Sequence, residues 1–243
     1  MGSMGEINGV KVYRAEPAGE PRGAIIVIHE IWGLVAQITG IADRWAAEGY
    51  LAVAPDIMSE VGITPEVGEE LSTAMKHPDE EVRTAMQPRL REALAPIRQP
   101  EYAAWAVAQL TALLDGLEEI SGIAGRIVVT GYCFGGTYSF ALAAEDDRVA
   151  AAVPFYGTAP ELTRIQDISC PILAFYGEID PPIIDKLPAV RAAMAEADID
   201  FTEVVYPGAK HAFFNETNSS TYHPEFAADA WAKATAFVSE RVG

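Results

Sequence analysis

Short apolar runs alternate along this chain with stretches of helical spacing, and this alternation limits the possible folds more than any other feature. Residues 24–29 (AIIVIH) are rich in β-branched side chains and lie between Gly23 and Glu30, which is typical of a strand buried on both faces. The alternation predicts an α/β fold with a mostly parallel central sheet and helices on both faces. The other expected strands are residues 51–55, 127–130, 150–155, 172–176 and 201–205, and the clearest expected helices are residues 36–48, 137–145, 186–197 and 225–242.

One segment departs from this order. Residues 59–99 contain many charges and several prolines, and they include no apolar strand. We interpret the segment as a mostly helical excursion at the edge of the sheet, either a lid or an inert addition. Residues 1–4 (MGSM) resemble a cloning remnant because a second Met follows Gly-Ser, so we expect a single domain over residues 5–243.

Acidic residues dominate the charge of the chain. There are 17 Lys and Arg residues against 35 Asp and Glu, which gives a net charge of −18. Such a surface repels nucleic-acid phosphates and anionic bilayers, so we expect no nucleic-acid or membrane partner. No apolar stretch is long enough to span a membrane, and two cysteines are too few for a disulfide framework. We therefore expect a cytoplasmic protein, and the sequence leaves open whether it is a monomer or a homodimer.

The most informative motif is IVVTGYCFGG at residues 127–136, which runs from an expected strand through Gly-x-Cys-x-Gly into an expected helix. This is the nucleophile-elbow pattern with Cys133 in place of serine. The turn is crowded, and Gly131 and Gly135 provide the room that it needs. The helix N-terminus that follows stabilises a thiolate. A buried structural cysteine, or a glycine-rich turn that binds an anion without catalysis, also fits this motif taken alone.

Two later loops add an acid and a histidine. Asp180 follows an expected strand and precedes two prolines, and His211 lies between the last expected strand and the last helix. Taken alone, Asp180 could instead be a residue that starts a turn before proline, and His211 could be a histidine of a surface loop. The order nucleophile, acid, histidine is that of α/β-hydrolases, and its occurrence at three strand ends indicates a catalytic triad.

Four motifs resemble those of the dienelactone hydrolase family, within the α/β-hydrolase superfamily. They are HEIWG at 29–33, GYCFGG at 131–136, GEID at 177–180 and GAKHAF at 208–213. The resemblance covers nearly the whole chain and implies an α/β-hydrolase fold. It also implies hydrolysis of an ester or lactone, such as dienelactone (the activity called carboxymethylenebutenolidase), with no cofactor and no metal.

The resemblance implies a role for each site residue. Cys133 would be the nucleophile, His211 the general base and acid, and Asp180 the group that fixes the imidazole tautomer. Glu30 would control when the thiolate forms, because a carboxylate near a thiol opposes its ionisation. The alternative for Glu30 is a solvated acid at a strand end. The backbone N–H groups of Ile31 and Phe134 would form the oxyanion hole.

The sequence departs from the family pattern at the substrate site. Members that act on dienelactone carry an arginine four residues after the catalytic histidine, and Asn215 occupies that position here. Neutral activated esters or lactones therefore join dienelactone-like compounds as expected substrates. Arg98 and Tyr102 are four residues apart and would face one ligand on a helix, although a solvated arginine beside a packed tyrosine also fits. Trp32 and Phe213 flank the motifs and are further candidates for substrate binding.

Three other functions fit parts of this pattern. A thiolate beside an oxyanion hole also attacks other electrophiles such as phosphotriesters, so a promiscuous hydrolase is the first alternative. A small-molecule-binding protein that retains the fold without turnover is the second. A redox-sensing thiol is the third, and it would require Cys170 to lie near Cys133.

Overall fold

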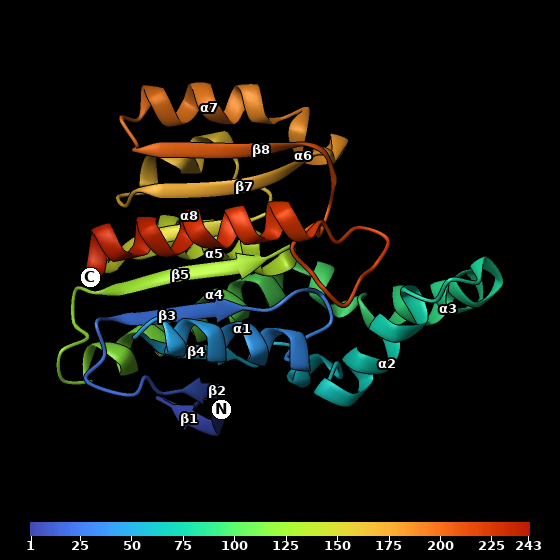
Figure 1. The fold of residues 1–243 in the computed structure, drawn as a ribbon, viewed down its shortest axis with the longest axis horizontal. Coiled ribbons are helices and arrows are strands. Elements are labelled where there is room, and N and C mark those ends of the chain that lie inside the picture. Colours follow the sequence, from blue (N-terminus) through green and yellow to red (C-terminus); the bar gives the residue numbers. More distant parts are fainter.

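An eight-stranded sheet forms the centre of the computed structural model, which describes residues 1–243. Its strands lie in the order β1-β2-β4-β3-β5-β6-β7-β8 (Figure 1). Strands β3 to β8 pair in parallel, whereas β1 and β2 are antiparallel to their neighbours. The expected mostly parallel sheet is confirmed. The strands are β1 Ser3–Ile7, β2 Val10–Ala15, β3 Ala24–Ile28, β4 Leu51–Pro55, β5 Ile127–Tyr132, β6 Val149–Phe155, β7 Ile172–Ile179 and β8 Phe201–Lys210.

Helices cover both faces of this sheet. α1 and α8 share one face, where Trp45 packs against Trp231 with ring centroids 4.7 Å apart, and α4 and α5 lie on the other (Figure 1). Every residue of β3 and β4 is consequently buried, as the apolar runs predict. None of the helices combines the length and hydropathy needed to cross a bilayer. The helices are α1 Ala36–Ala47, α2 Pro65–Met75, α3 Glu80–Ala93, α4 Pro100–Glu118, α5 Phe134–Glu145, α6 Pro181–Ile184, α7 Leu187–Glu196 and α8 Pro224–Val242.

The parallel strands bring chemically active side chains to one edge of the sheet. Glu30 follows β3, Cys133 follows β5, Tyr156 follows β6 and Asp180 follows β7. His211 comes directly after β8. Because the carboxyl ends of parallel strands meet at the same edge, residues scattered along the sequence converge there.

The edge hairpin formed by β1 and β2 is absent from the sequence prediction. Its strands alternate buried Val10 and Val12 with exposed Lys11, so they lack the continuous apolar run of a central strand. Residues 1–4, set apart as a cloning remnant, overlap this hairpin, because Ser3 and Met4 belong to β1 and pair with β2.

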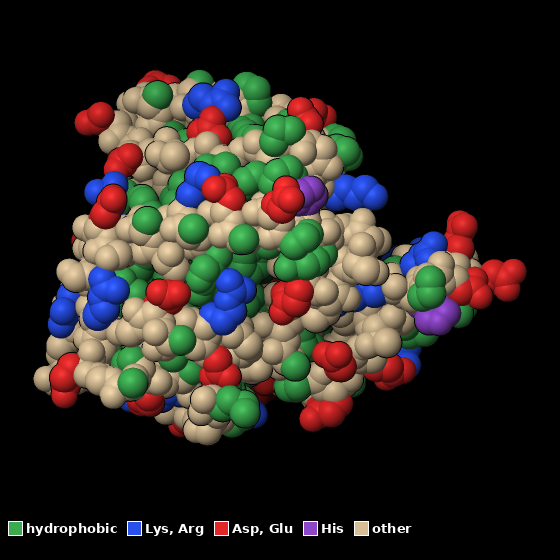
Figure 2. Space-filling view, in the orientation of Figure 1, with side chains coloured by type: hydrophobic (Ala, Val, Ile, Leu, Met, Phe, Trp, Pro, Cys, Tyr) green, Lys and Arg blue, Asp and Glu red, His purple; other side chains and the backbone are tan.

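The segment at residues 59–99 contains α2, α3 and two short 3-10 helices, Ser59–Val61 and Pro96–Arg98. α2 and α3 project beyond the carboxyl ends of β3 and β5 (Figure 1), and acidic side chains gather at the outer end of this projection (Figure 2). α3 buries none of its residues, whereas α2 packs against the loop after β3. A Cβ on Gly68 would lie 1.8 Å from the carbonyl oxygen of Trp32, so only glycine permits this contact.

The proposed pairing of Arg98 and Tyr102 on one helix is wrong. Gln99 between them has φ −81° and ψ 140°, an extended conformation that ends the 3-10 helix before α4 begins. Proline at position 100 favours such a break, because the residue before a proline avoids the helical region. Arg98 is exposed and Tyr102 is buried, which is the alternative that the sequence left open.

Candidate active site

Cys133 occupies a strained turn between β5 and α5. Its φ of 57° and ψ of −110° lie outside the regions that ordinary L-residues adopt. Such strain costs about 1–3 kcal/mol and persists only where the surroundings enforce it, most often at functional sites. A Cβ on Gly131 would lie 2.2 Å from the Gly135 oxygen, and one on Gly135 would lie 2.1 Å from the Ile28 oxygen. The two glycines therefore do provide the room that the motif predicts.

His211 is held by Asp180. The Nδ1 atom of His211 lies 2.6 Å from Oδ2 of Asp180, whose side chain is 10% exposed. Partial burial alone would lower the pKa of His211, but the hydrogen bond to Asp180 and the neighbouring Cys133 raise it to about 10. The imidazolium is therefore favoured at neutral pH when a thiolate faces it. An imidazolium in turn stabilises a thiolate.

Glu30 is a buried carboxyl group with two neutral hydrogen-bond donors. It is 3% exposed, accepts from the Asn215 amide at 2.7 Å and from the Tyr156 hydroxyl at 3.2 Å. Burial raises the pKa of Glu30. This rise is offset only in part by the hydrogen bond from Asn215, the charge of Lys76 and the hydrogen bond from Tyr156. The reading of Glu30 as a solvated acid is therefore wrong. Its environment favours the protonated, uncharged form.

Asn215 is a positioning residue for Glu30. The side chain is 2% exposed, and its oxygen accepts from the backbone N–H of Thr217 at 3.0 Å and from the Thr217 hydroxyl at 2.7 Å. These two bonds fix the amide so that its nitrogen points to Glu30. The sequence marked this position only as a missing arginine. The structure shows that a neutral donor replaces the expected cation beside the buried acid.

A cavity of about 240 Å³ lies over these groups. It includes Trp32 among the predicted substrate residues, but not Arg98, Tyr102 or Phe213. The Tyr102 hydroxyl instead donates to the Ile57 carbonyl at 2.6 Å. Phe213 is fully buried against Tyr156 and Tyr206. The residues lining the cavity are Glu30, Ile31, Trp32, Lys76, Cys133, His211, Ala212, Asn215, Asn218 and Thr221.

Lys76 is the functional candidate that sequence reasoning missed. It follows α2 and is the only Lys or Arg lining the cavity, and its Nζ donates to the Thr217 hydroxyl at 2.6 Å. Burial lowers the pKa of Lys76, while Glu30, Glu69 and Glu216 raise it. Charge patterning along residues 59–99 cannot reveal this position, because it does not show which turn of the projection faces the site.

Two backbone amides flank the site, at Ile31 in the cavity wall and at Phe134 directly after Cys133. Phe134 is the first residue of α5, so its N–H has no acceptor within the helix. Ile31 lines the cavity beside Cys133, and its N–H donates to no acceptor in the protein. Their assignment as an oxyanion hole stays a prediction.

Cys170 is at the other end of the sheet from Cys133. It precedes β7, whereas Cys133 follows β5, and the two strands run in the same direction. Both thiols are free, and burial raises the pKa of Cys170 to about 12. This separation argues against a resolving cysteine for a redox-sensing thiol.

The sheet order and the strained turn between β5 and α5 define an α/β-hydrolase. The model of the dienelactone hydrolase family matches residues 10–242, and the chain belongs to that family. Membership of this family supports the assignment of the protein as a hydrolase.

Individual relatives agree with this placement. The chain is 33% identical to a Saccharolobus solfataricus protein named "Putative carboxymethylenebutenolidase", covering 94% of this chain and 93% of the relative. It is 34% identical to "Protein usf" of Aquifex pyrophilus, over 99% of both chains. Among solved structures, a "Putative Dienelactone Hydrolase" from Klebsiella pneumoniae is 30% identical with a TM-score of 0.78, covering 98% of this chain and 95% of that one.

Proposed function

We propose that the protein hydrolyses esters or lactones through a Cys133–His211–Asp180 triad and a covalent thioester. The observation that carries the proposal is the strained Cys133 at the N-terminus of α5, beside an imidazole that Asp180 holds at 2.6 Å. A nucleophile and a base that line one cavity, with the base oriented by a third group, support an activated cysteine.

The reaction would proceed in two halves. The Cys133 thiolate attacks the carbonyl carbon, and the Ile31 and Phe134 amides stabilise the resulting oxyanion. Collapse of this intermediate breaks the bond to the alcohol oxygen, which takes the proton of His211 and leaves a thioester on Cys133. His211 then removes a proton from water, the hydroxide attacks the thioester carbonyl, and the acid departs as the Cys133 thiolate re-forms.

Glu30 would act on the resting state of the nucleophile. An ionised carboxylate in this cavity would oppose thiolate formation, whereas the protonated form favoured by burial does not. Asn215 and Tyr156 hold the neutral acid in place. A reducing compartment such as the cytoplasm would keep Cys133 as a free thiol.

The expected substrates are small and activated. The cavity volume of about 240 Å³ is below the usual range for ligand pockets, about 300–1,000 Å³. A thiolate is a better leaving group than an amine anion, so the tetrahedral intermediate of an amide collapses back to reactants. Aryl esters and strained lactones should therefore react, and peptide amides should not.

A substrate panel combined with intact-protein mass spectrometry tests this proposal. The panel contains an aryl ester, a neutral lactone, dienelactone, an aryl phosphotriester and a peptide amide. We expect turnover of at least one ester or lactone, and acid quenching should trap the acyl mass on a peptide containing Cys133. Faster turnover of the phosphotriester would favour the promiscuous alternative. Reversible binding of esters without product or adduct would support the non-catalytic alternative and contradict the proposal.

Lys76 should select substrates that carry a carboxylate. As the single Lys or Arg in the cavity, it can pair with such a group, while neutral esters have no partner for its charge. We expect Lys76→Met to raise KM for a carboxylate-bearing ester by about tenfold, the loss of one charged hydrogen bond, and to leave KM for a neutral ester nearly unchanged. Steady-state kinetics on a matched ester pair measures this difference. Lys233→Met on the exposed surface of α8 is the control, and equal effects of the two variants on both esters would remove Lys76 from substrate selection.

A further inference from the structure

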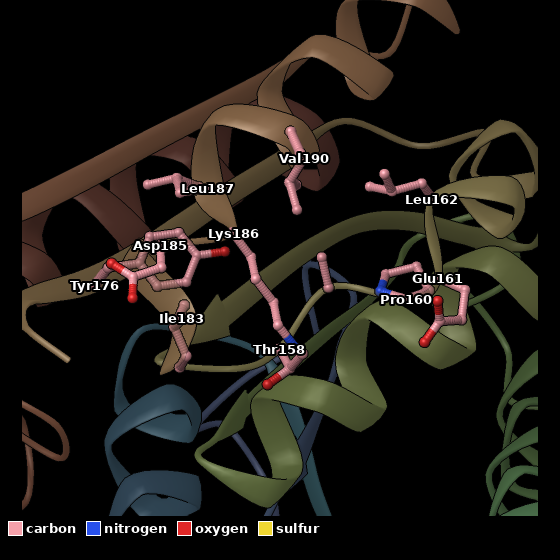
Figure 3. Close-up of a pocket in the computed structure, with 12 residues that line it drawn as sticks. Thr158, Pro160, Glu161, Leu162, Tyr176, Ile183, Asp185, Lys186, Leu187 and Val190 are labelled. Atoms are coloured by element: carbon pink, nitrogen blue, oxygen red, sulfur yellow. The ribbon is translucent and has the colours of Figure 1, made fainter. Parts of the chain in front are cut away.

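A second cavity lies apart from the catalytic one, between the loop after β6, the end of β7 and the α6–α7 segment. Its volume is about 330 Å³, which exceeds that of the catalytic cavity and falls within the usual range for small-molecule pockets, about 300–1,000 Å³. The two cavities have no lining residue in common. Figure 3 shows polar and apolar side chains from these elements converging on it.

Tyr176 supplies an unused donor to this cavity. The residue is 1% exposed, and its hydroxyl makes no hydrogen bond within the protein. Figure 3 shows the hydroxyl pointing toward the interior of the cavity. Burial raises the pKa of Tyr176, so the hydroxyl keeps its proton and can donate it. An acceptor atom on a ligand in the cavity would give this hydroxyl a hydrogen-bond partner.

Lys186 provides a cationic donor. Its side chain extends across the cavity toward Thr158 (Figure 3) and forms no ion pair with any carboxylate of the protein. The Thr158 hydroxyl is likewise unused, while its backbone N–H donates to Thr137 at 3.0 Å and fixes the loop. Donors on two separate elements therefore face the same space.

The remaining walls are apolar, with two acids among them. Ile183, Leu187 and Val190 are buried and form the apolar part. Glu161 and Asp185 are exposed. Their charges disfavour a ligand with several negative groups, so a single anionic group placed at Lys186 fits best.

We propose that this cavity binds a small monocarboxylic acid with an apolar body. The carboxylate would accept hydrogen bonds from Lys186 Nζ and the Tyr176 hydroxyl, and the apolar body would pack on Leu187 and Val190. Neither family membership nor the proposed triad requires this site.

Binding of benzoate to the full-length Cys133→Ala protein, measured by titration calorimetry and ligand-observed NMR, tests the proposal. Benzoate has no ester bond to hydrolyse, so the result does not depend on whether the triad is correct. Lys186→Met should weaken benzoate binding about tenfold, and Tyr176→Phe should weaken it severalfold, as expected for lost hydrogen bonds to a charged group. Lys233→Met, on the exposed surface of α8, is the matched control and should have no effect, whereas Lys76→Met reports any benzoate that binds in the catalytic cavity instead.

Two further ligands distinguish specific binding of an aromatic carboxylate from nonspecific binding of any anion. Benzamide keeps the ring without the charge and acetate keeps the charge without the ring, so each should bind at least several times more weakly than benzoate. Acetate binding as tightly as benzoate would show an adventitious ion on Lys186 and would overturn the proposal. So would an absence of benzoate binding, or a loss of affinity in Lys76→Met but not in Lys186→Met. Lys186 is exposed, so its variant is expected to fold normally.

Discussion

Replacing Cys133 by alanine should abolish ester hydrolysis, with a fall in kcat of about 10⁶-fold, the size of effect seen when the nucleophile of a serine triad is removed. The reason is that Cys133 is the only thiol lining the cavity, and it shares the cavity with His211. Alanine keeps a Cβ, so the backbone of the strained turn is retained and the protein should remain folded. Initial rates with an aryl ester measure kcat, and thermal unfolding of the wild type and Cys133→Ala measures whether the fold is retained.

Two companion variants make this result specific. Cys170→Ala removes the other thiol, which is buried at the far end of the sheet, and should leave kcat unchanged. Asp180→Asn keeps a similar shape but removes the charge that stabilises the His211 imidazolium, so it should also lower kcat strongly. Turnover by Cys133→Ala at the wild-type rate would remove Cys133 from catalysis, whatever the other variants do.

The central sheet and the position of Cys133, Asp180 and His211 at its carboxyl edge were predictable because each follows a local rule. A continuous apolar run such as β3 needs burial on both faces, and a Gly-x-Cys-x-Gly turn fits only between a strand and a helix. His211 and Asp180 could be placed because strand ends in a parallel sheet lie at one edge. No long-range contact had to be known for these predictions.

The parts that sequence could not predict depend on contacts between distant segments. Asn215 reads as the loss of an arginine, and only the fold shows that its amide meets Glu30, 185 positions away. Lys76 reaches the cavity because Gly68 lets α2 pack on the loop after β3. The unused hydroxyl of Tyr176 is invisible in an apolar run that otherwise predicts only a buried strand.

Glu30→Gln should make the protein more stable at neutral pH while it lowers activity. The folded-state pKa of Glu30 is raised above its ordinary value of 4.5. Between these two pKa values the folded protein holds a proton that the unfolded chain has lost, so stability falls as pH rises through this window. Glutamine carries no ionisable group, so the variant should not lose stability as pH rises through this window. Its oxygen can accept from Asn215 and its nitrogen can donate to the Tyr156 oxygen, so the hydrogen bonds are kept.

The expected gain at pH 7 is about 1–3 kcal/mol, the usual cost of a poorly satisfied buried polar group, or about 2–4 °C in Tm for each kcal/mol. Below the ordinary pKa of glutamate both states are protonated, so the gain should vanish near pH 4. Thermal unfolding of the wild type and Glu30→Gln from pH 4 to pH 8 measures this. Glu240→Gln, at an exposed position of α8 without an ion pair, is the control for loss of one charge and should show no such trend.

Activity should move in the opposite direction from stability. If Glu30 exchanges a proton during activation of the thiol, glutamine cannot replace it, and kcat should fall by about 10²–10⁴-fold, the usual contribution of a general acid or base. If the role of Glu30 were purely structural, Glu30→Gln would be more stable than the wild type and have the same kcat. If the buried carboxyl did not destabilise the fold, Glu30→Gln would show no pH-dependent increase in stability. A stability cost at neutral pH together with a loss of turnover on removal indicates a group retained for chemistry, because packing alone would be served better by a side chain that cannot ionise, such as glutamine.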